Sequence, residues 1–191
     1  AVLRDIPGIG IAVPASPEDA PAMLRTCLAS AAVDGTVCVF LEPIALYHSR
    51  DLYAPGDNGW TAPYAGPTDW VREHIPLGRA CVYGDGADLV IVTFGNGVPM
   101  SLRVAKRLAE SGVHARVLDL RWLAPRPLDD LLREARATGA VLVADETRAA
   151  AGVSEGVMAA LVDARFEGRV SRVTSKDSYI PLGPAAEMVL L

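Results

Sequence analysis

The chain has 191 residues, of which 51% are apolar and 21% are charged, and its formal net charge is −5. This length suits one large domain, or one domain with part of another, and the apolar share is ample for a core. The acidic balance argues against nucleic acid as a partner, and the lack of a long apolar run or a basic leader predicts a soluble, cytoplasmic protein with no membrane contact.

Residues 1–50 read as strand, helix and strand. The apolar run Ile9–Val13 predicts the first strand. Ser16-Pro17-Glu18-Asp19 has the form of a helix start, with a capping serine, a proline at the first helical position and acids in the first turn. This helix is expected to end near Asp34-Gly35, and Val37–Leu41 to form a buried strand. The apolar positions at helical spacing are Met23, Leu24, Cys27, Leu28 and Ala31.

Residues 51–78 are rich in proline and glycine and have no sustained period, which is typical of a domain connector or a long ordered loop. Trp60 and Trp70 lie in this stretch. Because a free linker is usually more polar, we expect the segment to pack against the rest of the chain.

From Arg79 onward, strands alternate with helices. The expected strands are Ala80–Tyr83, Leu89–Phe94, Val113–Leu120, Ala140–Ala144 and Val170–Thr174, and the expected helices are Pro99–Ser111, Pro127–Thr138, Ser154–Phe166 and Pro184–Leu190. The central strands are apolar at consecutive positions, which suits strands covered on both faces. The pattern predicts an α/β fold with right-handed crossovers and a doubly wound, mainly parallel sheet with helices on both faces.

Two glycine-rich turns resemble ligand-binding motifs only in part. Gly84-Asp85-Gly86 opens like a metal-and-diphosphate motif, but Glu110–Leu120 lacks the asparagine ligand that should follow. Gly95-Asn96-Gly97 begins like a dinucleotide fingerprint, but Met100 stands where the third glycine belongs. The first is interpreted as a plain turn into a strand. The second could still hold an anion at the start of the next helix.

Charged residues follow two of the expected strands. Asp145 and Glu146 leave the carboxyl end of a strand, where they could do acid–base work or, as we favour, cap helices and pair with arginine across an interface. Asp119 and Arg121 are expected to form an ion pair near the sheet end, before a turn stiffened by Trp122 and Pro125.

The sequence shows no arrangement of residues typical of a metal site or of a catalytic nucleophile. The three histidines lack metal-ligand spacing, and no nucleophile elbow is present. Cys27, Cys38 and Cys81 are expected to be small buried hydrophobes in a reducing compartment. From the residues alone we assign no catalytic or cofactor-binding residue.

The order of several segments resembles the β-type part of the thiamine-diphosphate-dependent 2-oxo acid dehydrogenases, the decarboxylating first component, within the transketolase superfamily. The segments that carry this resemblance are Pro7-Gly8, 17–20, 39–43 with Leu46-Tyr47, 88–95, 118–125, 145–148, 172–174 and 180–185. Together they span nearly the whole chain.

The resemblance implies a three-layer transketolase C-terminal domain at 79–191, a connector at 51–78 and the tail of the pyrimidine-binding domain at 1–50. The glutamate that activates the cofactor and the substrate-side histidine precede Pro7 in this family. The motif for diphosphate and magnesium belongs to the α-type part. The missing initiator methionine fits a fragment of a longer polypeptide, which we expect to be inactive alone.

The resemblance also implies a structural monovalent cation, potassium, and several partners. Counting back from Glu42 places the cation's ligands on Ala31, Asp34 and Thr36; the alternative is an aspartate that only closes the helix beside Gly35. The implied partners are an α-type part, a second β-type part and the lipoyl acyltransferase. A transketolase or deoxyxylulose-phosphate synthase tail and a non-catalytic interaction module are the alternative functions.

Overall fold

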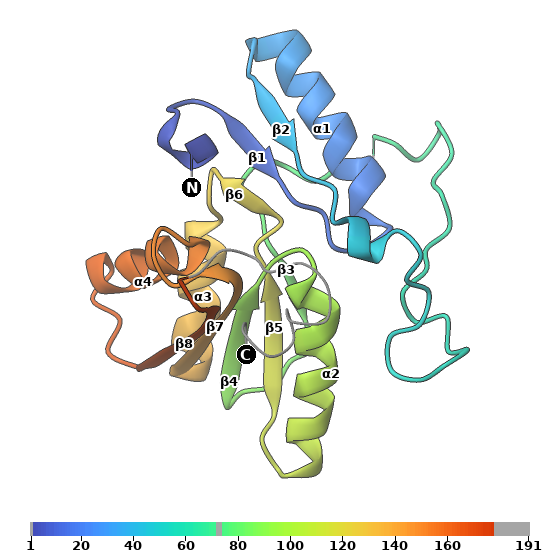
Figure 1. Cartoon of the computed structure of the whole chain (residues 1–191). Helices are drawn as coiled ribbons and strands as arrows, with labels where there is room; N and C mark the ends of the chain where they lie inside the picture. The colour runs from blue at the N-terminus through green and yellow to red at the C-terminus, as the bar shows by residue number, and fades with distance from the viewer. Residues whose placement is uncertain (1, 72–73, 178–191) are drawn as a thin grey trace.

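The computed structural model describes residues 2–71 and 74–177, and two sheets form its frame (Figure 1). The N-terminal part contains η1 (Val2–Asp5), β1 (Gly10–Ala12), α1 (Asp19–Asp34), β2 (Cys38–Phe40) and η2 (Ile44–Leu46). The remainder contains β3 (Cys81–Tyr83), β4 (Leu89–Thr93), α2 (Gly97–Glu110), β5 (Ala115–Asp119), β6 (Trp122–Ala124), α3 (Leu128–Thr138), β7 (Ala140–Arg148), α4 (Val153–Asp163) and β8 (Arg169–Ser175).

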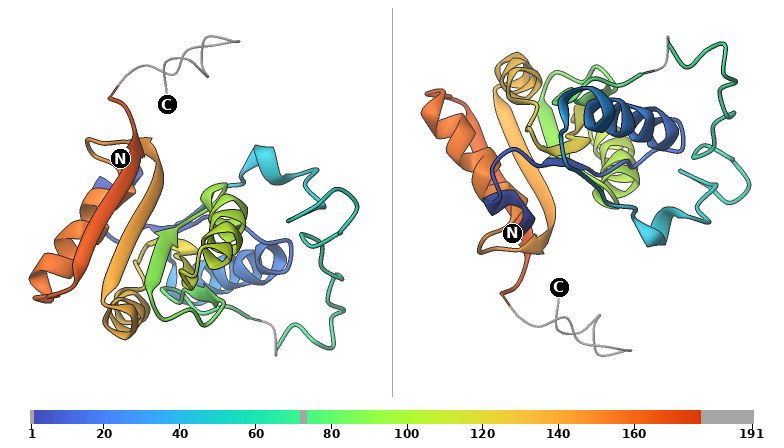
Figure 2. Two further views of the ribbon diagram at one scale, coloured as in Figure 1. Left: turned by 90° about the horizontal axis from the view of Figure 1, so that it is seen from below. Right: turned by 90° about the horizontal axis from the view of Figure 1, so that it is seen from above.

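The larger sheet has the order β3-β5-β4-β7-β8, and all its strand pairs are parallel except that of β3 with β5. The helices cover both faces (Figure 2). Helix α2 packs on the face that carries Ile91 and Val117, whereas α3 and α4 pack on the face that carries Val90, Val92 and Leu118. The predicted three-layer α/β fold is confirmed. Buried consecutive positions in β4 explain why both faces need a helical cover.

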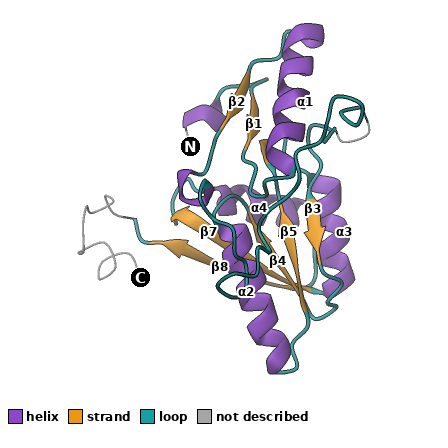
Figure 3. Cartoon of the chain, turned by 90° about the vertical axis from the view of Figure 1, so that its right-hand side faces the viewer, coloured by secondary structure: helices purple, strands orange, loops and turns teal. Residues whose placement is uncertain are grey.

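The smaller sheet, β2-β1-β6, contains a strand that the sequence analysis assigned to a turn. Trp122–Ala124 forms β6 and pairs antiparallel with β1, so residues after β5 complete the N-terminal sheet. A three-residue strand whose partner lies more than a hundred residues away leaves little local signal. Trp122 is fully buried beneath this sheet with Met23 and Cys27 of α1. Figure 3 shows the smaller sheet and α1 above the larger sheet.

Helix α1 ends as predicted but begins at Asp19, two residues after the expected first helical position Pro17, and its apolar face is only partly buried. The Asp19 N–H donates to Ser16 Oγ at 3.1 Å, and Gly35 closes the helix in the left-handed conformation. Met23 and Cys27 are buried. The side chains of Leu24 and Leu28, which share the helical spacing, are exposed.

The segment between the two sheets has no helix or strand at 51–71 or 74–78, yet it is packed in place. Leu52 and Trp60 are buried in the core on the α2 face of the large sheet. Asp57 organises the loop by accepting backbone N–H groups from four residues, which holds the pKa of its carboxyl well below the usual range, with the bond from Gly59 as the largest cause.

Several boundaries differ from the prediction. Strand β7 runs to Arg148 instead of Ala144, because its end pairs with β8 after a register shift. Helix α4 ends at Asp163 instead of Phe166. The helix expected at Pro184–Leu190 lies outside the described residues. Gly112 and Gly139 follow α2 and α3 in the left-handed conformation.

The three cysteines are free thiols, Cys27 buried and Cys38 and Cys81 half-buried. Burial raises the pKa of Cys27 to about 12, and the neighbouring Cys38 adds to this shift. Within residues 2–71 and 74–177, no helix is long and apolar enough to cross a membrane.

Candidate functional site

A crevice lies at the carboxyl ends of β4 and β7, where the chain changes winding direction. The crossover through α2 leads from β4 to β5 on one side, and the crossover through α4 leads from β7 to β8 on the other. Such a switch point is where open α/β sheets place their ligands. A cavity of about 480 Å³ occupies it, bounded by η1, the smaller sheet, the loop after β4, the end of β7 and the start of α4.

The polar side chains that line this crevice include those of Arg4, Glu42, Asn96, Glu146 and Thr147. Asn96 Nδ2 donates to Glu146 Oε2 at 3.3 Å. Burial raises the pKa of Glu146, with a further rise from Asp145 and an opposing effect of the Asn96 hydrogen bond. Asn96 Oδ1 is buried and has no hydrogen-bond partner within the described part of the chain. The crevice therefore places a carboxyl group with a raised pKa beside an amide side chain.

Asp145 has a structural role, as favoured from the sequence. Its Oδ2 accepts the Ser154 N–H at 2.7 Å, at the start of α4, and its Oδ1 accepts the Thr147 N–H and hydroxyl at 2.9 and 2.7 Å. Both carboxylate oxygens are thus engaged, which removes Asp145 as a general base. The expected ion pair between these carboxylates and an arginine such as Arg148 across an interface stays a prediction.

Replacing Asp145 with alanine is expected to lower the free energy of unfolding by about 1–2 kcal/mol, because the start of α4 loses its cap and Ser154 N–H is left buried without a partner. Urea denaturation followed by circular dichroism measures this loss. The control is Asp163→Ala, an exposed change at the other end of α4. Equal stability of the two variants would contradict the capping role.

The loop Gly95-Asn96-Gly97 does not provide the anion site that its sequence left open. The N–H groups of Gly97 and Val98 donate to the carbonyls of Phe94 and Gly95, both at 3.1 Å. Gly97 is required for packing, since a Cβ there would collide with Thr93 Oγ1. The two glycines therefore serve the tight turn from β4 into α2.

A second buried charge cluster joins α1 to the end of β5. The Arg121 guanidinium binds Asp19 in a bidentate ion pair, with Nε to Oδ2 at 2.7 Å and Nη2 to Oδ1 at 2.5 Å. The expected pair with Asp119 is wrong: Asp119 Oδ1 accepts only the Arg121 backbone N–H, at 2.9 Å. Arg121 has φ +58°, and this left-handed turn separates it from the regular alternation of the strand.

Asp119 is fully buried next to this ion pair. Burial raises its pKa to about 7; the Arg121 backbone N–H and guanidinium oppose the rise, and Asp19 adds to it. Its Oδ2 has no partner among the described atoms. Asp119 therefore titrates near neutral pH inside the fold.

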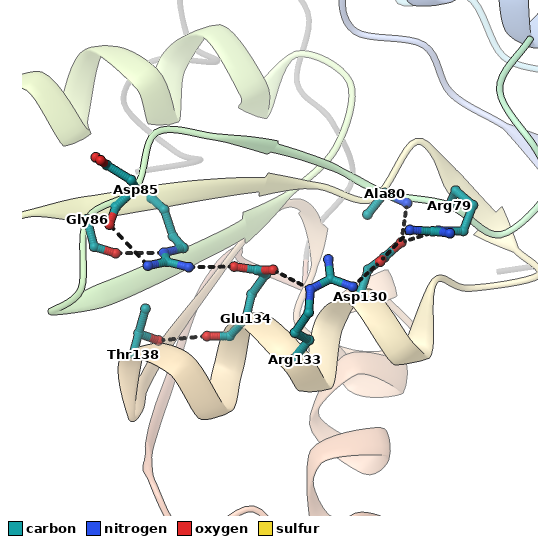
Figure 4. Close-up of polar contacts among 9 residues, drawn as sticks. Arg79, Ala80, Asp85, Gly86, Asp130, Arg133, Glu134 and Thr138 are labelled. Atoms are coloured by element: carbon teal, nitrogen blue, oxygen red, sulfur yellow. Dashed lines mark hydrogen bonds and ion pairs between the residues drawn. The ribbon is translucent and has the colours of Figure 1, made fainter.

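The turn Gly84-Asp85-Gly86 is a structural element, as interpreted from the sequence. Arg116 on β5 donates to the carbonyls of Gly86 and Asp85 at 2.6 and 3.1 Å, and its Nη1 pairs with Glu134 on α3 at 2.7 Å. Figure 4 shows the network continuing along α3. The carbonyl oxygens of this turn are therefore occupied by arginine, which does not fit a metal-and-diphosphate motif.

The network along α3 also anchors the end of the connector. Asp130 accepts from Arg79 Nε at 2.9 Å, from the Ala80 N–H at 2.9 Å and from Arg133 Nη1 at 2.6 Å. These contacts and the desolvation that opposes them leave the pKa of the Asp130 carboxyl below its usual range. The connector thus enters the large sheet at a defined position.

The three residues proposed for a cation lie together at the end of α1. Ala31 and Asp34 are exposed and belong to its last turn, and Thr36 follows Gly35 and donates its N–H to the Ser30 carbonyl at 3.3 Å. Within the described ranges, no group of three or more histidine, cysteine, aspartate or glutamate side chains is arranged to hold a metal ion.

Comparison with protein families gives one match, the C-terminal domain of transketolase, over residues 78–190. The chain belongs to the transketolase C-terminal domain family. It is 33% identical over 187 residues to the pyruvate dehydrogenase E1 component subunit beta of Bacillus subtilis (strain 168), covering 96% of this chain and 52% of that protein.

Two other relatives widen the comparison. The 1-deoxy-D-xylulose-5-phosphate synthase 1 of Geobacter sulfurreducens is 29% identical over 97% of this chain and 26% of its own length. A solved structure described as a split gene transketolase, inactive beta4 tetramer, superposes with a TM-score of 0.70 and 26% identity over 92% of this chain and 51% of that chain. The chain thus spans about half the length, or less, of these relatives.

Proposed function

We propose that this chain is the C-terminal part of a thiamine-diphosphate-dependent 2-oxo acid dehydrogenase, which decarboxylates a 2-oxo acid and transfers the acyl group to a lipoyl acyltransferase. The observation that carries the proposal is the 33% identity to an E1 subunit beta over nearly the whole chain, residues before the family domain included. Magnesium with the cofactor, and potassium at Ala31, Asp34 and Thr36, belong to the same proposal.

The chain's own role in this scheme is support. The cofactor supplies the carbanion chemistry, and the Gly84–Gly86 turn does not fit its diphosphate, since Arg116 binds the carbonyls of Asp85 and Gly86. We therefore assign no step of that chemistry to these residues. The chain would hold the α-type part and a second β-type part, and would offer a surface to the acyltransferase.

Exposed apolar side chains on the smaller sheet support a role within a longer assembly. Leu28, Val33 and Val37 on α1 and before β2 are 62%, 81% and 64% exposed, and β2 is an edge strand. An exposed apolar patch beside an unpaired strand edge usually marks an interface. In the proposal, the pyrimidine-binding domain that residues 1–50 conclude covers this surface.

The test is an activity assay of the longer polypeptide that carries this chain, together with its α-type part. We expect thiamine-dependent decarboxylation of pyruvate or of a branched-chain 2-oxo acid, and no turnover by the 191-residue chain alone. Turnover by the isolated chain would overturn the supporting role. Calorimetry with the peripheral domain of the acyltransferase tests whether the chain binds this partner. If no binding is measured, the acyltransferase is no longer part of the proposal.

The alternative function is the tail of a deoxyxylulose-phosphate synthase or transketolase, which the relative from Geobacter sulfurreducens favours at 29% identity. The same assay with ketose phosphates separates the two. Turnover of ketose phosphates without turnover of 2-oxo acids would replace the first proposal with the second.

A further inference from the structure

Arg126 is a half-buried arginine in the turn between β6 and α3, and it lines a cavity of about 560 Å³. The cavity is open to solvent and is lined by this turn, by η1 and by the first turns of α4. Figure 2 shows η1 beside α4, where Arg4 donates to the carbonyls of Ala151 and Gly152 at 2.7 and 3.0 Å. Within residues 2–71 and 74–177, Arg126 forms no ion pair.

Gly156 allows the guanidinium of Arg126 to lie directly on α4. A Cβ at this position would collide with Arg126 Nη1. Glycine weakens a helix interior relative to alanine, and no turn or positive φ requires it here. A larger residue at this position would require the Arg126 guanidinium to move away from α4.

Two acids share the cavity with this cation, but neither lies within ion-pair distance of it in the described ranges. Burial lowers the pKa of Arg126, and the nearby Arg4 lowers it further. Asp5 and Glu155 also line the cavity, but the Glu155 carboxylate accepts the Ala151 N–H at 2.9 Å, and neither acid pairs with Arg126.

On its other side, too, Arg126 forms no ion pair with a carboxylate in the described ranges. It lines a second cavity of about 400 Å³ with Arg79, Arg133 and Asp130. Asp130 is bound by both of these arginines, at 2.9 and 2.6 Å. Asp129, also in this cavity, is exposed at the start of α3 and makes no ion pair in the described ranges.

We propose that Arg126, assisted by Arg4, binds a phosphate-type oxyanion: free phosphate or the phosphate group of a small metabolite. The planar guanidinium can give two parallel N–H bonds to such a group. The cavity is also within the roughly 300–1,000 Å³ typical of small-molecule sites. This site is separate from the proposed dehydrogenase chemistry and would let an anionic metabolite act on the fold between η1 and α4.

Isothermal titration calorimetry of the chain at constant ionic strength tests the proposal, with inorganic phosphate and glycerol 3-phosphate as probes. We expect saturable binding, at least tenfold weaker for Arg126→Gln. Arg136→Gln removes the same charge from an exposed position on α3 and should bind as the wild type does. Tighter binding of glycerol 3-phosphate supports a metabolite ligand, and equal or tighter binding of inorganic phosphate supports the free ion.

Gly156→Ala provides a variant that keeps both arginines. Its methyl group should push the guanidinium from α4 and weaken phosphate binding, while circular dichroism shows α4 intact. Absence of saturable binding by the wild type would overturn the site. So would wild-type affinity in Arg126→Gln, or in Gly156→Ala.

Discussion

Replacing Asp19 with asparagine is expected to lower the free energy of unfolding by about 3–5 kcal/mol, because the partner of a buried arginine loses its charge. The side chains of Asp19 and Arg121 are 3% and 15% exposed, so water screens little of their interaction. Burial acts to lower the pKa of Arg121, yet the hydrogen bonds and charge of Asp19 raise it. Without Asp19, the guanidinium would remain desolvated and unpaired.

Chemical denaturation of Asp19→Asn, Arg121→Gln and the double variant measures the coupling between the two side chains. The control is Glu18→Gln, which removes one negative charge from an exposed neighbouring position. The Glu18→Gln change should lower the free energy of unfolding only slightly. A loss below about 1 kcal/mol for Asp19→Asn would place the pair among exposed salt bridges and contradict its structural importance.

This ion pair matters because it joins parts of the chain that are 102 residues apart. Together with β6, it fastens the smaller sheet and α1 to the carboxyl end of the larger sheet. The crevice between β4 and β7 is bounded by both sheets, so its shape depends on these two connections. Loosening them is expected to disturb the crevice before it disturbs the large sheet.

The alternation of strands and helices could be predicted from the sequence because its signals are local. The consecutive apolar residues of β4 and the glycines that close α2 and α3 act within one turn or one strand. Strand β6 and the partner of Arg121 could not be predicted, since each depends on residues about a hundred positions away. Asp119 stands beside Arg121 in the sequence, but the left-handed turn at Arg121 makes Asp19 the partner.

The sequence singled out the carboxylates Asp145 and Glu146 and favoured a capping role for them, but it assigned no catalytic or cofactor-binding residue at this position. The switch point follows from strand order, and Asp145 with Glu146 marks it in the sequence. Tertiary packing then assigns Asp145 to the start of α4 and turns Glu146 toward Asn96. Two adjacent carboxylates on a strand point to opposite faces, so their different surroundings follow from the geometry of the strand.

Stability is expected to fall as pH rises from 5 to 8, because Asp119 holds a proton in the folded state. The pKa of this carboxyl is about 7 when folded and 3.8 in its ordinary state. Between these values the folded chain binds one proton more than the unfolded chain. Protonation therefore stabilises the fold at low pH, and this contribution is lost as pH rises through the folded pKa. The loss from pH 5 to pH 8 is about 2–3 kcal/mol.

Asp119→Asn isolates this effect from other titrating groups. Asparagine is neutral at every pH and keeps an oxygen for the Arg121 N–H, so the variant should gain about 2–3 kcal/mol relative to the wild type between pH 5 and pH 8. Urea unfolding at several pH values measures both curves, with the exposed Asp163→Asn as the control. Parallel curves for wild type and Asp119→Asn would mean that Asp119 stays ionised in the fold, so that Arg121 and its backbone N–H outweigh burial.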